Sequence, residues 1–167
     1  MIYFFLCLFM AGIVAADQLV KAAIVSRYAP YVEYWLANGI APAVPRAEWG
    51  ALVPGIVHLT FQPNTGAAFS FLSGRTWIFL VITALFFVLV GIALWKKWLK
   101  TKPELWAMAA ICGGALGNLI DRLVNGYVVD MFEVEFMDFA VFNVADCFIT
   151  CGAIALVLSV LLEGKRK

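Results

Sequence analysis

Four long apolar runs, separated by more polar segments, dominate the pattern of hydrophobic and polar positions along this chain. They cover about residues 2–25, 76–96, 104–122 and 139–162. About 20 residues of helix are needed to cross the roughly 30 Å of hydrocarbon in a bilayer. The run from Trp77 to Trp95 contains no charged residue, and the other three contain few. The pattern therefore predicts four transmembrane helices.

The connection at about residues 26–75 has a different pattern, because it contains five of the six prolines. Proline interrupts helical hydrogen bonding, so we expect turns and short strands here and not a continuous helix. The segment "IVHLTF" consists of β-formers and ends at the turn signal "QPNTG", which predicts a strand near the membrane surface. In the second connection, at about residues 123–138, "EVEFMD" alternates acidic and apolar residues and predicts another strand with one solvated face.

These segments together define the expected fold class. We expect an all-α membrane protein, a bundle of four transmembrane helices with a small extracytoplasmic β-sheet and loop, forming one domain over residues 1–167. Hydrophobic residues make up 64% of the chain and charged residues only 14%, against about a quarter in soluble proteins. The formal net charge of +1 provides no basic surface for nucleic acid. His58 is the only histidine, so no paired-histidine zinc motif exists, and we expect neither metal nor cofactor.

The distribution of lysine and arginine predicts the orientation, because short cytoplasmic connections collect basic residues. Four lysines lie in "KKWLKTK" (96–102), between the second and third runs, and residues 165–167 are also basic. With four crossings, both termini are then cytoplasmic and the two long connections face the outside. A cleavable signal peptide is the alternative for the first run, because "GIVAAD" resembles a cleavage site. No basic segment precedes it and cleavage would leave three crossings, so we expect the run to be retained.

Six of the eleven acidic residues lie between Asp121 and Asp146, and this concentration marks a candidate site. Ionisable residues inside a membrane are costly and are functional candidates by default. Three of the six are expected to be solvated or to interact with a helix dipole: Glu133, Glu135 and Asp138. Asp121 is followed by Arg122 and lies one turn after Asn118, so it is expected to be a paired brace with a structural role.

Asp130 and Asp146 have no basic neighbour in the sequence. Asp146 is expected one to two turns into the fourth helix, and Asp130 in the short loop that returns to that end, so the two carboxylates can meet at one depth. Two carboxylates that meet without a cation tend to share a proton. The charged member can then act as general base on a water while the protonated member polarises a carbonyl. This arrangement predicts peptide-bond hydrolysis without a metal.

Polar residues nearby are expected to support this pair. Asn143 and Asn118 each precede an aspartate by three residues, which places the two side chains on one helical face. Asp17 and Lys21, four residues apart in the first helix, can form an ion pair across one turn. The GxxxG pattern at 113–117 lets helices approach closely and indicates packing more than chemistry.

Four motifs occur in order along nearly the whole chain. They are "DQLVK" in the first helix, "NTGAAFSFL" before the second, "GGALGNLIDRLVNGYVVD" from the third helix into its loop, and "FNVAD" at the fourth. With these motifs the chain resembles the bacterial lipoprotein signal peptidases, the signal peptidase II family. Four motifs in the family's order make the resemblance highly specific. It implies a four-helix membrane bundle with a small extracytoplasmic sheet.

The resemblance also implies an activity, that of an aspartic endopeptidase of the bacterial cytoplasmic membrane. Such an enzyme removes signal peptides from prolipoproteins that carry a diacylglyceryl-cysteine, and it cleaves on the amino side of that cysteine. The family's catalytic pair matches Asp130 and Asp146, near the extracytoplasmic face. The supporting residues that the resemblance implies are Asp17, Lys21, Asn64, Gly66, Asn118, Asp121, Arg122 and Asn143. We further expect the protein to be a monomer whose partners include membrane lipids. The resemblance also implies that the cyclic peptide globomycin inhibits it.

Three other functions are alternatives. A small transporter or proton-coupled channel would relay protons through carboxylates, but its ionisable residues would be distributed through the depth of the membrane. A non-enzymatic membrane scaffold explains the GxxxG pattern but not the paired carboxylates. A Ser-Lys peptidase would use Ser70 or Ser73 with Lys21, although no lysine lies near these serines in the sequence.

Overall fold

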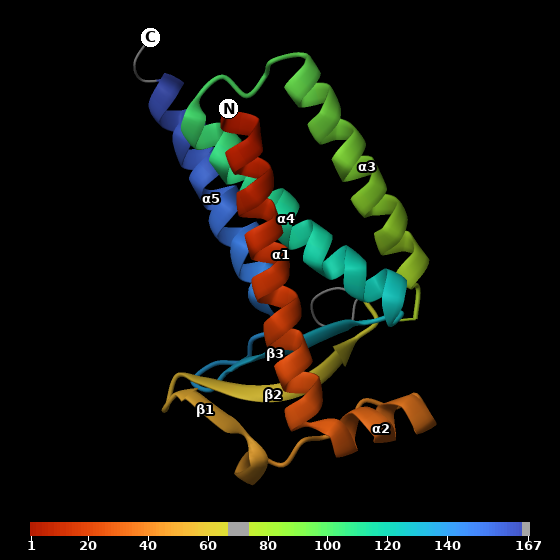
Figure 1. Ribbon diagram of the computed structural model, residues 1–167. Coiled ribbons are helices and arrows are strands. Elements are labelled where there is room, and N and C mark those ends of the chain that lie inside the picture. Colours follow the sequence, from red (N-terminus) through yellow and green to blue (C-terminus); the bar gives the residue numbers. More distant parts are fainter. Residues whose placement is uncertain (67–73, 165–167) are drawn as a thin grey trace. The chain divides into compact units, whose positions relative to one another are not determined.

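The computed structural model describes residues 1–66 and 74–164. Figure 1 shows its elements, which are, in chain order, α1 (Ile2–Arg27), α2 (Ala29–Asn38), the 3-10 helix η1 (Arg46–Glu48), β1 (Gly50–Val53), β2 (Val57–Asn64), α3 (Thr76–Trp95), α4 (Lys102–Val124), β3 (Val128–Val134) and α5 (Val144–Gly164). The contacts within the chain define two compact units. The first comprises Met1–Asp17, Trp77–Ile120 and Val144–Lys167, and the second comprises Gln18–Thr76 and Asp121–Asn143. One domain over 1–167 stays a prediction.

The first unit contains all or most of each long apolar helix. In the part of the chain that the structure describes, four helices are long and apolar enough to cross a membrane, namely α1, α3, α4 and α5. This finding confirms the four predicted spans. No side chain of α3 is buried by the rest of the protein, and a helix that is apolar on all sides suits surroundings of lipid.

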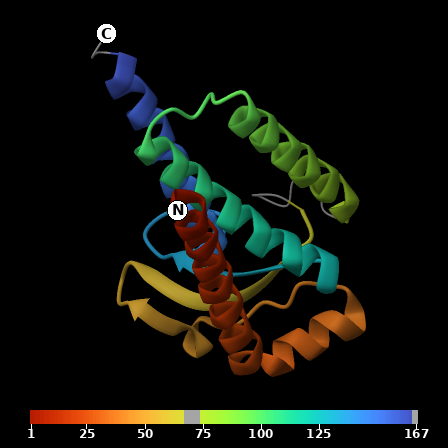
Figure 2. The ribbon, with the colours of Figure 1, turned by 45° about the horizontal axis from the view of Figure 1, so that its top comes forward.

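Two glycines allow α4 to approach α1 closely. A Cβ atom at Gly113 would lie 3.0 Å from the Ile13 side chain, and one at Gly117 would lie 2.5 Å from Asp17 Oδ2. Figures 1 and 2 both show the two helices side by side. Small residues are what such a close approach requires, so the predicted packing role of the GxxxG pattern is confirmed.

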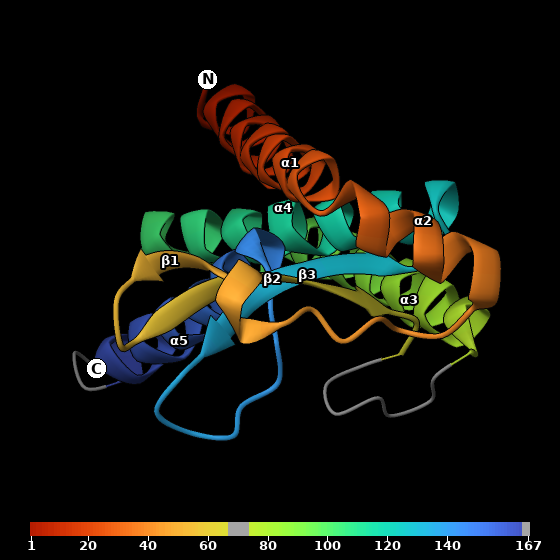
Figure 3. The same ribbon diagram turned by 90° about the horizontal axis from the view of Figure 1, so that it is seen from below.

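The second unit is built around a three-stranded antiparallel sheet in the order β1-β2-β3 (Figure 3). In the β2–β3 pairing, Asp130 lies opposite Gln62 and Glu133 lies opposite His58. The hydrophobic core of this unit combines side chains from the sheet, the end of α1, α2 and the loops. Its buried members are Ile24, Tyr28, Val32, Val44, Phe61, Tyr127, Val129 and Met131. The small sheet expected from the sequence is therefore present.

The first connection contains a helix, α2, that the sequence analysis did not predict. Pro30 lies in its first turn, where the missing N–H of proline costs no helical hydrogen bond. The helix ends at Gly39, whose φ is 67° and whose N–H donates to the Trp35 carbonyl, a common way to terminate a helix. Proline therefore did not exclude a helix at the start of this connection.

The second predicted strand is displaced along the sequence. β3 covers Val128–Val134 and not 133–138, so the prediction that Asp130 lies in a loop is wrong. The first four residues of this strand are all buried, and a strand buried on both faces shows no alternation of polar and apolar residues. The alternating segment that suggested a strand mostly follows it.

The fourth membrane helix begins later than predicted, at Val144 and not at 139. Phe142 pairs with Phe132 of β3 in a β-bridge, and backbone hydrogen bonds join the two residues. Phe142 is therefore paired with β3 just before the helix begins. Asp138 lies six residues before the helix, too far for the predicted interaction with the helix dipole, which falls off within one turn.

Candidate active site

Most of the predicted site residues are buried polar side chains. Among the described residues eight polar or charged residues are buried, and six of them belong to the predicted site: Asp17, Lys21, Asn118, Asp121, Asp130 and Asn143. Burying a charged group costs several kcal/mol unless the group is paired and hydrogen-bonded. The partners of these side chains show how the fold compensates for that cost.

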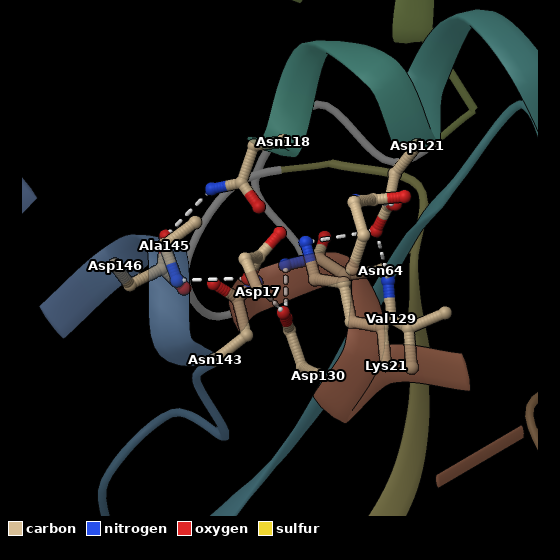
Figure 4. Close-up of polar contacts among 11 residues, drawn as sticks. Asp17, Lys21, Asn64, Asn118, Asp121, Val129, Asp130, Asn143, Ala145 and Asp146 are labelled. Atoms are coloured by element: carbon tan, nitrogen blue, oxygen red, sulfur yellow. Dashed lines mark hydrogen bonds and ion pairs between the residues drawn. The ribbon is translucent and has the colours of Figure 1, made fainter. Parts of the chain in front are cut away.

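Asp130 lies on β3 in the second unit and is 2% exposed. Both oxygens of its carboxylate accept a hydrogen bond from an asparagine amide, as Figure 4 shows. Asn143 Nδ2 donates to Oδ1 at 2.6 Å, and Asn64 Nδ2 donates to Oδ2 at 2.8 Å. Hydrogen bonds are directional, so two amides that donate to the two oxygens fix the orientation of the carboxyl group.

Asn64 is itself oriented by a turn at the end of β2. The Gly66 N–H donates to Asn64 Oδ1 at 2.9 Å, a side-chain-to-backbone bond typical of Asx turns. Because this bond engages the oxygen, the amide nitrogen is directed to Asp130. Arg122 Nη2 donates to the Gly66 carbonyl at 3.2 Å. The structure thus connects Arg122, Gly66 and Asn64 in a chain of hydrogen bonds that ends at the Asp130 carboxyl group.

Asp121 forms a buried ion pair with Lys21 of α1. Lys21 Nζ lies 2.9 Å from Asp121 Oδ2, and the two side chains are 4% and 2% exposed. Gln18 Nε2, one turn earlier on α1, donates to Asp121 Oδ1 at 2.9 Å. The prediction that Asp121 is a paired, hydrogen-bonded brace is confirmed, but its cation is Lys21 and not the neighbouring Arg122 that suggested the pairing. Consecutive residues of a helix do not face each other, and the partners come from a different helix.

The Asp121 carboxylate also holds the strand that carries Asp130. The Val129 N–H donates to Asp121 Oδ2 at 3.1 Å, and Val129 immediately precedes Asp130 in the chain. The oxygen that binds Lys21 therefore also satisfies a buried strand N–H. An unpaired buried N–H would cost about as much as a lost hydrogen bond, so the ion pair restrains β3 next to the candidate catalytic carboxylate.

Asp146 lies in the first unit, in the first turn of α5, nearer to the start of the helix than the predicted one to two turns. Asn118 Nδ2 of α4 donates to Asp146 Oδ1 at 2.8 Å. A carboxylate in the first turn of a helix also interacts favourably with the helix dipole. Asp146, like Asp130, is thus held by an asparagine amide.

Asp17 of α1 caps the start of α5. Its Oδ1 accepts the Ala145 N–H at 2.9 Å, and its side chain is fully buried. The first N–H groups of a helix have no partner within the helix, and a side-chain oxygen can satisfy one of them. The sequence analysis proposed only an ion pair with Lys21 for Asp17. It could not indicate this contact, because the two residues are 128 positions apart.

Two further details of the site differ from the sequence analysis. Gln18 was missed, although it lies three residues before Lys21 and hence on the same helical face; this spacing was the available signal. Asn143 was expected to share a helical face with Asp146. It instead precedes α5 and donates to Asp130.

The Ser-Lys alternative depends on Ser70 and Ser73, which lie outside the described residues, as does the basic segment 165–167. Within 1–66 and 74–164, no group of three or more His, Cys, Asp or Glu side chains could hold a metal ion.

Tyr127, in the loop after α4, packs edge-on against Trp35 with 5.8 Å between the ring centroids. Burial, and secondarily the negative charge of Asp121, raise the pKa of the Tyr127 hydroxyl above its ordinary value of 10. Tyr127 therefore stays neutral at physiological pH and adds no negative charge near the Lys21–Asp121 pair.

The whole structure is similar to two solved bacterial membrane enzymes. One has a TM-score of 0.77 at 27% identity, with 97% of this chain and 90% of that chain covered. The other has a TM-score of 0.72 at 27% identity, with 93% and 92% covered. Together with four membrane-spanning helices and buried, hydrogen-bonded carboxylates, this similarity defines the class as that of a multi-pass membrane enzyme.

The family follows from the sequence comparisons. The family model described as signal peptidase (SPase) II matches residues 9–162. Two lipoprotein signal peptidases of Streptococcus pyogenes are 42% and 41% identical to this chain over 156 residues, with 90% of this chain and 89% of each relative covered. The chain belongs to the signal peptidase II family, whose members are proteases that remove signal peptides from lipoproteins.

Proposed function

We propose that this chain is an aspartic endopeptidase whose catalytic dyad is Asp130 and Asp146. The observation that carries the proposal is that asparagine amides orient both carboxylates. Asp130 accepts from Asn143 and Asn64, and Asp146 accepts from Asn118. The Asn143 that binds one aspartate lies only three residues before the other. Oriented carboxylates are what general acid–base catalysis requires.

In the proposed reaction, one carboxylate of the dyad is ionised and the other is protonated, as expected for two carboxylates that share a proton. The ionised carboxylate takes a proton from a water, and the water oxygen bonds to the carbonyl carbon of the substrate. The protonated carboxyl donates a hydrogen bond to the carbonyl oxygen, which gains negative charge. The C–N bond then breaks, and the leaving nitrogen receives a proton from the dyad.

Membership of the family supports a particular substrate class, prolipoproteins whose cysteine carries a diacylglyceryl group. Cleavage falls on the amino side of this cysteine. A lipid-modified precursor remains in the membrane, which suits an enzyme with four membrane-spanning helices. Globomycin, a cyclic peptide, is expected to block the same site. The enzyme acts as a monomer surrounded by membrane lipids.

The proposed location is the bacterial cytoplasmic membrane, with both termini in the cytoplasm. The four lysines between α3 and α4, at 96–102, support this orientation, because short cytoplasmic connections collect basic residues. The two longer connections, which carry the strands, then face the outside, and the active site lies near the extracytoplasmic surface.

Five further residues are proposed to position the dyad: Asp17, Lys21, Gly66, Asp121 and Arg122. Asp121 acts through the Val129 N–H, next to Asp130. Arg122 acts through Gly66, which orients Asn64. Asp17 acts on the first turn of α5.

The dyad can be tested by measuring cleavage of a lipid-modified precursor by the purified, reconstituted enzyme. Asp130→Asn and Asp146→Asn are each expected to abolish cleavage while the protein still inserts, because an amide cannot serve as a base. Asp138→Asn, which changes an exposed carboxylate of the same connection, is the control and is expected to cleave normally.

Near-normal turnover of either dyad variant would exclude the proposed mechanism. Loss of activity only on changing Ser70 or Ser73 would favour the Ser-Lys peptidase instead. A metal chelator is expected to leave turnover unchanged.

A further inference from the structure

The turn that joins α3 to α4 concentrates basic and aromatic side chains at one membrane surface. Trp95 and Trp98 are 79% and 64% exposed. The lysines of this turn are all exposed: Lys96, Lys97, Lys100 and Lys102. Because α3 and α4 both span the membrane, their connection (Figure 1) lies at a bilayer surface. The proposed peptidase chemistry makes no use of these side chains.

The first half of the turn is a defined helix end. The Trp98 N–H donates to the Ala93 carbonyl at 2.9 Å, and the Lys97 N–H donates to the Leu94 carbonyl at 3.1 Å. This pair of bonds is the Schellman motif, in which the residue just past the helix end is left-handed and usually glycine. Here that residue is Lys97, with φ of 54°, the one non-glycine residue with positive φ in the described parts of the chain. A side chain in this conformation costs roughly 1–2 kcal/mol, so a lysine occupies a position where glycine would be less strained.

The second half of the turn is a capping box at the start of α4. The Glu104 N–H donates to Thr101 Oγ1 at 3.4 Å, and Glu104 Oε2 accepts from the N–H groups of Lys100 and Thr101 at 2.6 and 3.0 Å. Such reciprocal bonds satisfy N–H groups that a helix start leaves open. Both ends of the turn are therefore held by hydrogen bonds, and the lysines extend from a preorganised backbone.

The acidic residues near this turn do not neutralise its lysines. Glu104 is 3% exposed, and its carboxylate accepts from the backbone N–H groups of Lys100 and Thr101. Within the described parts of the chain, none of the four lysines forms an ion pair with a carboxylate. Lys96 Nζ lies instead 5.2 Å from the centre of the Trp95 ring, a cation–π distance. The turn is thus a fixed, uncompensated positive surface.

We propose that the α3–α4 turn binds the headgroups of anionic phospholipids. The lysines contact the phosphates, and Trp95 and Trp98 lie at the headgroup level, where tryptophan is enriched in membrane proteins. Basic residues next to a membrane helix gain about 1 kcal/mol each from anionic lipid. Anionic phospholipid complements the charge of the turn. A second copy of the chain bound through the same turn would instead place four lysines against four lysines.

The preference for anionic over zwitterionic lipid can be measured with spin-labelled lipids. Spin-labelled phosphatidylglycerol or phosphatidylcholine is added to the purified enzyme in phosphatidylcholine nanodiscs, and the fraction of each label bound to the protein is compared. The wild-type chain is expected to retain more of the anionic label, and the variant with all four lysines changed to Gln is expected to bind both labels equally. High salt should reduce the wild-type preference, because it screens exposed charges. The control variant, with Lys165, Arg166 and Lys167 changed to Gln, is expected to lose less of the preference, because it keeps all four lysines and both tryptophans of the turn. An unchanged preference without the four lysines, or equal loss in the control, would overturn the proposal.

Lys97→Gly separates lipid binding from stability. The change removes one charge but relieves the left-handed strain, so the unfolding temperature in phosphatidylcholine is expected to stay equal or rise while the anionic preference falls by up to about fivefold. Lys97→Gln should lower the preference equally without the gain in stability. If Lys97→Gly keeps the full preference, Lys97 does not contribute to lipid binding. If the variant unfolds at a lower temperature, the left-handed lysine does not destabilise the turn, and this part of the argument fails.

Discussion

The Asn143 amide donates a 2.6 Å hydrogen bond to Asp130 Oδ1, and both side chains are buried. Asn143 immediately precedes α5, so the residue that leads into this membrane helix orients a carboxylate on β3. A hydrogen bond to a carboxyl group contributes about 0.5–1.5 kcal/mol when that group is neutral and about 1.5–3 kcal/mol when it is ionised. The geometry therefore makes Asn143 a positioning residue for the proposed base or acid.

Asn143→Ala is expected to lower kcat by about tenfold to a hundredfold, with a smaller effect on KM, because 1.4 kcal/mol corresponds to a factor of ten. The reconstituted cleavage assay measures both constants. Asn125→Ala, at an exposed asparagine of the loop after α4, is the matched control and should match wild type. An unchanged kcat in Asn143→Ala would show that the bond has no part in catalysis.

The buried Lys21–Asp121 pair is expected to stabilise the fold as well as the site. Lys21→Met leaves the Asp121 carboxylate without its cation, and breaking a buried pair in this way costs about 3–5 kcal/mol. Denaturant unfolding in detergent measures the loss. Lys21→Arg, which keeps the charge, should lose less. In a double-mutant cycle with Asp121→Asn, the coupling energy should exceed about 1 kcal/mol; purely additive effects would contradict a direct interaction.

Gly117→Ala tests the contact between α4 and Asp17. Alanine is a better helix former than glycine by about 1 kcal/mol, yet its Cβ atom would lie 2.5 Å from Asp17 Oδ2. We expect lower stability and reduced turnover, because Asp17 must move and loses its bond to the Ala145 N–H. Gly91→Ala in α3 is the control, since its Cβ would meet nothing within 4 Å. The prediction fails if both variants are equally stable.

Glu133 provides a test of pH dependence in the sheet. Burial raises the pKa of its carboxyl above the ordinary value of 4.5, and nearby Arg46 and His58 oppose this shift. The folded state therefore binds this proton more tightly than the unfolded state does. The protonated carboxyl contributes to the free energy of unfolding below pH 4.5, and this contribution is lost as the pH rises through the folded-state pKa.

Glu133→Gln is therefore expected to unfold like wild type at pH 4 and at a slightly higher temperature at pH 8. The gain should be a fraction of a kcal/mol, because the side chain is only partly buried. Thermal unfolding at the two pH values measures it. A variant that is less stable than wild type at pH 8 would show that the ionised carboxylate stabilises the sheet.

The sequence by itself determined the membrane crossings and the family, and it supplied most of the polar residues of the proposed site. These properties depend on local information. An uncharged segment such as Trp77–Trp95 is long enough to span a bilayer whatever it packs against, and the family motifs are contiguous in the chain. The acidic cluster from Asp121 to Asp146 was also visible without coordinates.

Only the tertiary structure decided which partner each of these residues has and where the later elements begin. Gln18 and Asp121 are 103 positions apart, and Asn64 and Asp130 are 66 apart, so no local pattern could pair them. Phe142, just before α5, forms a bridge with Phe132, which is ten positions away in the chain. Sheet pairing and buried hydrogen bonds are long-range interactions, and their free energy depends on segments that meet only when the chain has folded.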